Sequence, residues 1–157
     1  MKRQAAVSRM AVAASLAATG LVTTPAHADR VYHSEHLKLA PVAGAPLKSG
    51  FVQNVKAEGP VVYAHEIFVL NGAGRQATYT VTRNFFPFDP DCSGDNGVFA
   101  SDVATLTTNE NGNARADLFV RPEQVAGFEG VHGVKWTVRD GSGAVTYGTR
   151  CTGVTLD

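Results

Sequence analysis

The fold is decided by Ala77-Thr78-Tyr79-Thr80-Val81-Thr82-Arg83, a stretch in which apolar and polar side chains alternate. Ala77, Tyr79 and Val81 share one parity, and three threonines take the other. Successive side chains of a β-strand point to opposite faces, so the stretch predicts a strand that packs on one side and meets water on the other. The rest of the chain after residue 29 also lacks a sustained 3.6-residue period, which predicts an all-β protein.

Turn residues beyond this strand predict hairpins. Asn71-Gly72-Ala73-Gly74 follows an apolar segment at residues 60–70, so we expect these residues to pair with the strand. Asn-Gly is the strongest short hairpin signal, and Asn111-Gly112 predicts a second hairpin between residues 103–108 and 113–120.

A third hairpin is predicted where Asp140-Gly141-Ser142-Gly143 joins residues 131–139 to residues 144–156. We also expect a short helical turn within residues 122–130, with Pro122 at its start. Trp136 is the only tryptophan and is predicted to be a core anchor.

These strands, six or seven if residues 50–55 also pair, predict a sandwich of two antiparallel sheets at residues 50–157. An immunoglobulin-like Greek key is the first expectation for their order, and a small closed barrel is the alternative. Residues 29–49 contain Pro41, Pro46 and several Ala and Gly, so we expect a flexible arm there.

Residues 1–28 have the pattern of a cleaved signal peptide. Three basic residues and no acid precede an apolar stretch at Met10–Val22, and Ala26-His27-Ala28 supplies small residues for cleavage after Ala28. The stretch covers roughly 20 Å as a helix, too short for a hydrocarbon core of about 30 Å. No later segment is long and apolar enough to span a bilayer, so the sequence predicts a secreted protein.

Cleavage changes the charge of the protein. The whole chain has 14 basic and 14 acidic residues, and removing Lys2, Arg3 and Arg9 leaves 11 basic against 14 acidic, a formal charge of −3. Nucleic-acid binding needs a basic stripe, and no segment after residue 28 clusters Lys or Arg. We therefore expect no nucleic-acid partner.

The two cysteines, Cys92 and Cys151, are predicted to form a structural disulfide, since an exported chain with two cysteines normally joins them. A redox or nucleophilic thiol is the alternative, but the chain has no Cys-x-x-Cys motif.

Histidines and acids suggest a metal site without a known ligand spacing. His65, Glu66 and His132 are the candidate ligand or metal residues, and His33, Glu35 and His36 lie close together in the expected arm. His65 and Glu66 are neighbours on a predicted strand, so their side chains should point to opposite faces. No metal is assigned with this set, and no cofactor is predicted.

An acidic loop and a serine turn offer two other kinds of candidate site. Asp89, Asp91, Ser93, Gly94 and Asp95 resemble the start of a calcium loop, but the twelfth position is Ala100, where a bidentate Glu is required. The chain contains no Gly-x-Ser-x-Gly, and Ser142 sits in a Gly-Ser-Gly turn without an activating partner in the sequence.

The most unusual apolar segment is Asn84-Phe85-Phe86-Pro87-Phe88. Phe85, Phe86 and Phe88 cannot all share one inward parity, so they are a candidate binding patch. The alternative is that the chain bends there and buries the three rings under the following loop.

Several segments resemble a family of small secreted bacterial proteins of uncharacterised function. They are Glu58-Gly59-Pro60-Val61-Val62-Tyr63-Ala64-His65-Glu66, Leu70-Asn71-Gly72-Ala73, Ala77-Thr78-Tyr79-Thr80-Val81, Leu106-Thr107-Thr108-Asn109, Gly112-Asn113-Ala114 and Thr149-Arg150-Cys151-Thr152. The resemblance covers roughly residues 50–157. It implies export and a β-sandwich, and it implies no catalytic residues.

The sequence thus favours a secreted, non-catalytic binding or envelope-associated β-sandwich module. We expect it to act as a monomer on a small ligand or another protein. A Cu- or Zn-binding extracytoplasmic domain is the first alternative, and a hydrolytic enzyme is the second.

Overall fold

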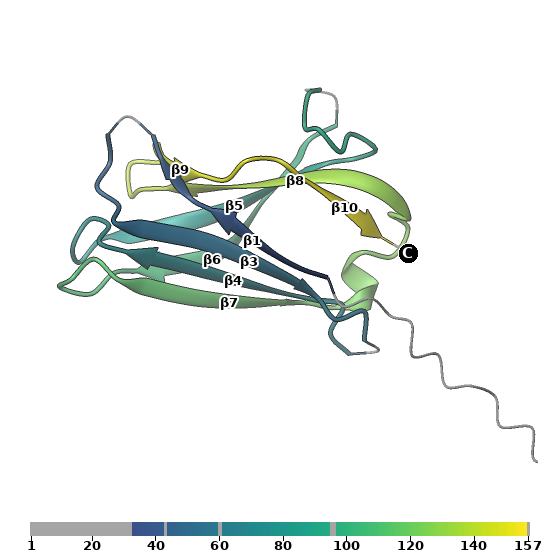
Figure 1. Cartoon of the computed structure of the whole chain (residues 1–157), viewed down its shortest axis with the longest axis horizontal. Helices are drawn as coiled ribbons and strands as arrows, with labels where there is room; N and C mark the ends of the chain where they lie inside the picture. Colours follow the sequence, from purple (N-terminus) through teal and green to yellow (C-terminus); the bar gives the residue numbers. More distant parts are fainter. Residues whose placement is uncertain (1–32, 43, 60, 95–96, 157) are drawn as a thin grey trace, which may run out of the picture.

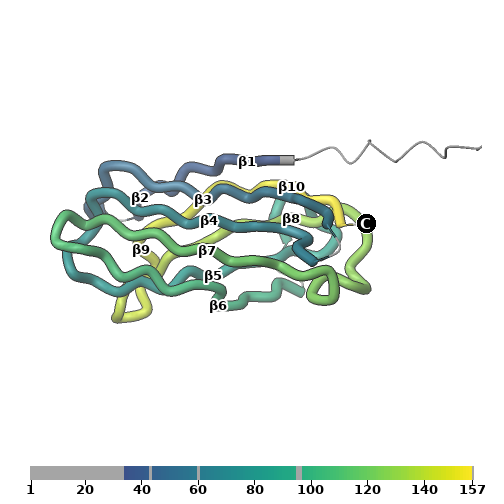
Figure 2. The backbone as a smooth tube through the Cα atoms, turned by 90° about the horizontal axis from the view of Figure 1, so that it is seen from below, coloured from purple at the N-terminus to yellow at the C-terminus, as the bar shows by residue number. Residues whose placement is uncertain are grey.

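The computed structural model describes residues 33–42, 44–59, 61–94 and 97–156. The chain forms two antiparallel sheets that face each other (Figures 1 and 2), which confirms the predicted all-β sandwich. The predicted signal peptide and cleavage site at residues 1–28 lie outside the described residues. No helix in the described ranges is long and apolar enough to cross a membrane.

The first sheet has the spatial order β1 (His33–Lys38), β3 (Ser49–Lys56), β4 (Ala64–Asn71) and β7 (Ala114–Val120). The second has the order β2 (Ala40–Pro41), β9 (Val145–Gly148), β8 (Gly130–Arg139), β5 (Thr78–Phe86) and β6 (Phe99–Thr107). The last strand, β10 (Thr152–Leu156), also pairs with β8. The predicted strand at residues 50–55 is therefore present, as β3.

The core lies between the sheets and follows the alternation seen in the sequence. Tyr79 and Val81 of β5 are 5% and 0% exposed, and their threonine neighbour Thr80 is half-buried on the other face. Trp136 is fully buried, as predicted, and it shares its face of β8 with Val134 and Val138.

The first two predicted hairpins are wrong, because each joins strands of different sheets. β4 pairs with β3 and β7, whereas β5 pairs with β6 and β8. Residues 72–77 carry the chain from the first sheet to the second, and residues 108–113 carry it back from β6 to β7.

The two crossing segments lie side by side, which explains their turn residues. The Ala73 N–H donates to the Gly112 carbonyl at 3.0 Å, and the Gly72 N–H donates to Asn113 Oδ1 at 3.1 Å. Gly112 has a φ of +73°, and a Cβ there would lie 2.2 Å from the Ala73 carbonyl oxygen. The Asn-Gly pair therefore permits a close approach of two backbones instead of a two-residue hairpin turn.

The third prediction is confirmed for the hairpin of β8 and β9. The segment at residues 144–156 is interrupted after Gly148, however, and continues as β10, which pairs with another part of β8. The predicted helical turn is a 3₁₀ turn, η1 (Pro122–Gln124), and Pro122 begins it.

The prediction of a flexible arm at residues 29–49 is wrong for the part that the structure describes. β1 pairs with β3 along its whole length, and β2 pairs with β9. Leu37 and Leu39 are 0% and 1% exposed. β1 is an edge strand of its sheet. The two leucines alternate with polar residues, and their inward side chains contribute to the core.

The predicted disulfide is present between Cys92 and Cys151, whose Cα atoms lie 5.9 Å apart. It ties the loop after β5 to the residue that precedes β10. The loop lies directly against β8, since a Cβ on Gly133 would be 2.2 Å from the Asp89 carbonyl oxygen.

Candidate functional site: a cavity between the sheets

A cavity of about 280 Å³ opens between the two sheets at the end where β3 finishes and β4 begins. Its walls come from strands of both sheets and from the segment around η1. Apolar and aromatic side chains dominate the walls: Tyr63, Ala64, Phe85, Phe99, Val120, Val125, Phe128, Val134, Trp136, Val154 and Leu156. Such a concave, mainly apolar lining with a few polar groups is typical of small-molecule sites.

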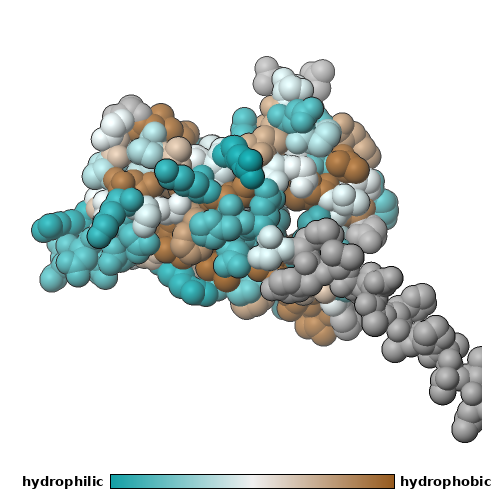
Figure 3. Space-filling view, viewed as in Figure 1, coloured by the Kyte–Doolittle hydropathy of each residue, from teal (hydrophilic) through white to brown (hydrophobic). Residues whose placement is uncertain are grey.

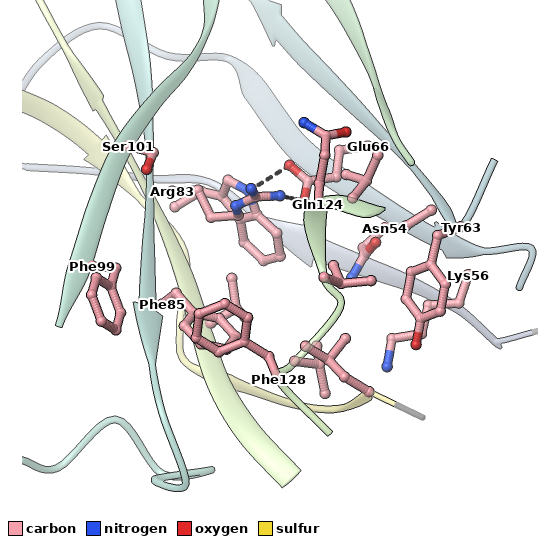
Figure 4. A pocket seen from close by; sticks show the side chains of 17 residues that line it. Asn54, Lys56, Tyr63, Glu66, Arg83, Phe85, Phe99, Ser101, Gln124 and Phe128 are labelled. Carbon is pink, nitrogen blue, oxygen red and sulfur yellow. Dashed lines mark hydrogen bonds and ion pairs between the residues drawn. The ribbon is translucent and has the colours of Figure 1, made fainter. Parts of the chain in front are cut away.

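A buried carboxylate lies in the wall of this cavity (Figure 4). Glu66 is 3% exposed and sits on the inner face of β4, between the inward-facing Ala64 and Phe68. The Arg83 guanidinium donates to Oε1 at 2.9 Å, and the Trp136 indole N–H donates to Oε2 at 3.0 Å. Both oxygens therefore accept a hydrogen bond, as a buried charge requires.

The strand register places these three groups together. Arg83 of β5 pairs with Trp136 of β8 in the second sheet, and both reach across to Glu66 in the first. The Arg83 side chain is 27% exposed, so the ion pair lies at the boundary between the packed core and the cavity.

Asn54 of β3 lies beside Glu66, as its partner in the register of β3 and β4. Asn54 is 8% exposed and lines the cavity, and its amide points into it (Figure 4). Its Oδ1 atom is the one buried side-chain nitrogen or oxygen atom in the described part of the chain that has no hydrogen-bond partner. Buried polar groups are normally paired, so this atom requires an explanation.

Three phenylalanines form the opposite wall. Phe85 and Phe128 meet edge to face with ring centroids 5.6 Å apart, and Phe99 lies 6.2 Å from Phe128. Phe99 and Phe128 are 54% and 38% exposed, so aromatic surface reaches the mouth of the cavity.

His132 packs behind this aromatic wall and contacts the segments that carry its phenylalanines. It is fully buried, its Nδ1 accepts from the Phe88 N–H at 3.1 Å, and its Nε2 lies 3.0 Å from the Phe128 carbonyl oxygen. Because a backbone N–H can only donate, Nδ1 must be the acceptor, and the ring is neutral with its proton on Nε2. The ring also contacts Phe85 at a centroid distance of 4.8 Å.

The structure does not gather His65, Glu66 and His132 into one site. His65 points away from Glu66, as predicted, and lies on the outer face, where its Nε2 is 2.8 Å from Asp117 Oδ1 and its ring stacks on Phe119 at 4.3 Å. Hydrogen bonds from Arg115, and secondarily from His65, lower the pKa of Asp117. Within the described residues, no group of three His, Cys, Asp or Glu side chains could hold a metal ion.

The other polar candidates also have structural partners. Glu35 accepts a hydrogen bond from the Thr152 hydroxyl and lies 3.6 Å from Arg150, and the His36 ring packs on Phe51. The side chain of His33 lies outside the described part of the chain.

In the loop that resembles a calcium site, Asp89 accepts from the Gly94 N–H at 2.7 Å and from the Ser93 hydroxyl at 3.2 Å. The Gly94 hydrogen bond is the main cause of the lowered pKa of Asp89. Asp95 lies outside the described residues.

The three phenylalanines of the candidate patch go to different places. Phe85 lines the cavity, Phe86 is 5% exposed with the Lys135 ammonium 4.8 Å from its ring centroid, and Phe88 is 72% exposed. On the face shown in Figure 3, hydrophobic residues likewise lie in separate patches among hydrophilic ones.

Sequence reasoning missed most of the cavity lining, including Asn54, Arg83, Phe99 and Phe128. For Arg83 a signal was present, because it shares the inward parity of Tyr79 and Val81. For the two phenylalanines no local signal exists, since only the fold brings β6 and the segment before β8 together. Comparisons with protein-family models, with curated proteins and with solved structures find no match for this chain.

Proposed function

We propose that this protein is an exported, non-catalytic β-sandwich that binds a small, largely apolar molecule in the cavity between its sheets. The observation that carries this proposal is the aromatic-lined cavity of about 280 Å³, which opens beside an otherwise packed core. A cavity of about 150 Å³ is enough for benzene, so this one suits a molecule of about two fused rings.

The polar groups of the cavity favour binding over catalysis. Glu66 is buried and already accepts hydrogen bonds from Arg83, its counterion, and from Trp136, so the carboxylate is held in a structural ion pair. His132, the histidine behind the aromatic wall, uses both ring nitrogens in contacts with the backbone. These groups therefore shape the cavity instead of reacting with its contents.

Export is supported by the signal-peptide pattern of residues 1–28, by the disulfide and by the resemblance to small secreted bacterial proteins. The strand orders β3-β4-β7 and β9-β8-β5-β6, with the chain changing sheets at each of the links β4–β5, β6–β7 and β7–β8, favour an immunoglobulin-like Greek key. We take the binding unit to be a monomer, because both walls of the cavity come from one chain.

Trp136 supplies a direct test, since its indole N–H is the only one in the chain and lies at the cavity. Naphthalene should shift its NMR signal saturably in the disulfide-bonded protein. Ser101→Phe, at the cavity wall on β6, should weaken this binding about tenfold or more by filling space. Thr105→Phe, an exposed position on the same strand outside the cavity lining, should leave it unchanged.

No shift up to the solubility of naphthalene, or equal weakening by both substitutions, would overturn the proposal.

A further inference from the structure

One oxygen atom in the cavity wall, Oδ1 of Asn54, calls for a hydrogen-bond donor. Asn54 is 8% exposed, points into the cavity and has an Oδ1 atom without a hydrogen-bond partner among the described residues. Every other buried side-chain nitrogen or oxygen atom in that part of the chain is paired. Leucine or valine would fill the same inward position of β3 without this cost, as Val52 does two residues earlier.

The charges beside Asn54 bear on the charge of the occupant. Glu66 already has Arg83 as its counterion and accepts a further hydrogen bond from Trp136, so a second cation beside it would meet a carboxylate whose charge is already balanced. An anion placed against Asn54 would lie next to the Glu66 carboxylate, its neighbour in the strand register, and the Lys56 ammonium in the lining already donates to the Thr155 carbonyl at 2.6 Å. Burying either charge without a counterion is unfavourable, so the occupant that fits is neutral.

The shape of an amide defines the complementary group. The Asn side chain presents one acceptor oxygen and one donor nitrogen side by side, and it pairs with a group that offers a donor and an acceptor in the same spacing. The edge of a lactam, with an N–H next to a C=O, has this arrangement. The walls opposite, at Phe85, Phe99 and Phe128, suit a flat aromatic body.

We infer that the cavity binds a neutral, planar molecule of about two fused rings that carries a lactam-like edge, and that the Asn54 amide forms hydrogen bonds with this edge. The inference rests on the proposed function, because it names the ligand class of the same cavity.

The test uses four probe classes and the Trp136 indole signal of the disulfide-bonded protein. 2-Quinolone carries the lactam edge, N-methyl-2-quinolone lacks its donor, and naphthalene has the ring body alone. 2-Naphthoate and 1-naphthylmethylammonium add a charge to the same body. We expect 2-quinolone to bind about tenfold tighter than naphthalene and than its N-methyl derivative, and also tighter than either charged probe.

Asn54→Leu should abolish this preference, so that 2-quinolone, its N-methyl derivative and naphthalene bind the variant with affinities within about twofold of one another. Gln53→Leu is the matched control, because Gln53 is the next residue on β3, hydrogen-bonds Ser34 and does not line the cavity. It should keep the preference for 2-quinolone.

The outcomes separate the two proposals. If naphthalene binds but 2-quinolone binds no tighter, or if the preference survives in Asn54→Leu, the ligand class is wrong and the binding function stands. Tightest binding of a charged probe also overturns the ligand class. If no probe shifts the indole signal, the proposed function itself fails.

Discussion

Replacing Asn54 with leucine should stabilise the protein in the absence of ligand, although most substitutions of buried residues destabilise. An unpaired buried acceptor costs about 1–3 kcal/mol, and Asn54 Oδ1 is such an atom in a side chain that is 8% exposed. Leucine removes this cost and keeps a similar volume against the cavity. We expect a gain of about 1–2 kcal/mol in the free energy of unfolding, or roughly 4–8 °C in Tm for a domain of this size.

Urea unfolding measures this change, with the fluorescence of the fully buried Trp136 as the signal. The matched control is Asn84→Leu, on β5. Asn84 Nδ2 donates to Thr137 Oγ1 at 3.2 Å and to the Lys135 carbonyl at 3.3 Å, so its loss should destabilise by about 1–2 kcal/mol. Because both substitutions replace a strand asparagine with leucine, the difference in strand propensity between Asn and Leu affects the two variants similarly.

A variant Asn54→Leu that is no more stable than the wild type would refute this reasoning. It would mean that the Asn54 amide is already satisfied in the free protein, and the case for a ligand group that pairs with it would be lost.

Three further predictions follow from other parts of the structure. Glu66→Gln should destabilise by about 2–4 kcal/mol in urea unfolding, because it leaves the Arg83 guanidinium, whose side chain is 27% exposed, without its counterion; a change under about 0.5 kcal/mol would show that the pair contributes little. Replacing Cys92 and Cys151 together with alanine should cost about 4 kcal/mol, since the bridge spans 59 positions of sequence, and an unchanged unfolding midpoint would contradict this role. The pKa of Asp117 lies below its ordinary value of 3.8, chiefly because of Arg115, so its stabilising contribution is complete above that pH and is lost as the pH falls through the lowered pKa. The stability difference between wild type and Asp117→Asn should therefore shrink on acidification, and a difference that stays constant with pH would exclude the effect.

The fold class could be predicted because strand alternation is local. The outward positions Thr78 and Thr80 and the inward positions Tyr79, Val81 and Trp136 follow from parity alone, whereas Thr82, next to a register shift with β6, is buried against it. The sheet to which each strand belongs could not be predicted, because a turn sequence such as Asn111-Gly112 is compatible with a hairpin and with a close crossing of two links. The strand pairings of β6 and β7 and the contact of Gly112 with Ala73 distinguish them.

The candidate site was partly encoded in the same parity. Glu66 and Arg83 are charged residues at inward positions of strands, and such positions demand partners across the core. What no local pattern encodes is the space between the partners. The cavity exists because Phe99, Phe128 and Asn54, distant in sequence, border it without filling it.

The most direct test of the central claim is a map of backbone and indole NMR shifts during titration with 2-quinolone. A small molecule in the cavity predicts the largest changes at Asn54, Arg83, Phe128 and the Trp136 indole, with saturation at one ligand per chain. Shifts confined to the outer face around His65 and Phe119, or no saturable shifts with either 2-quinolone or naphthalene, would contradict the claim.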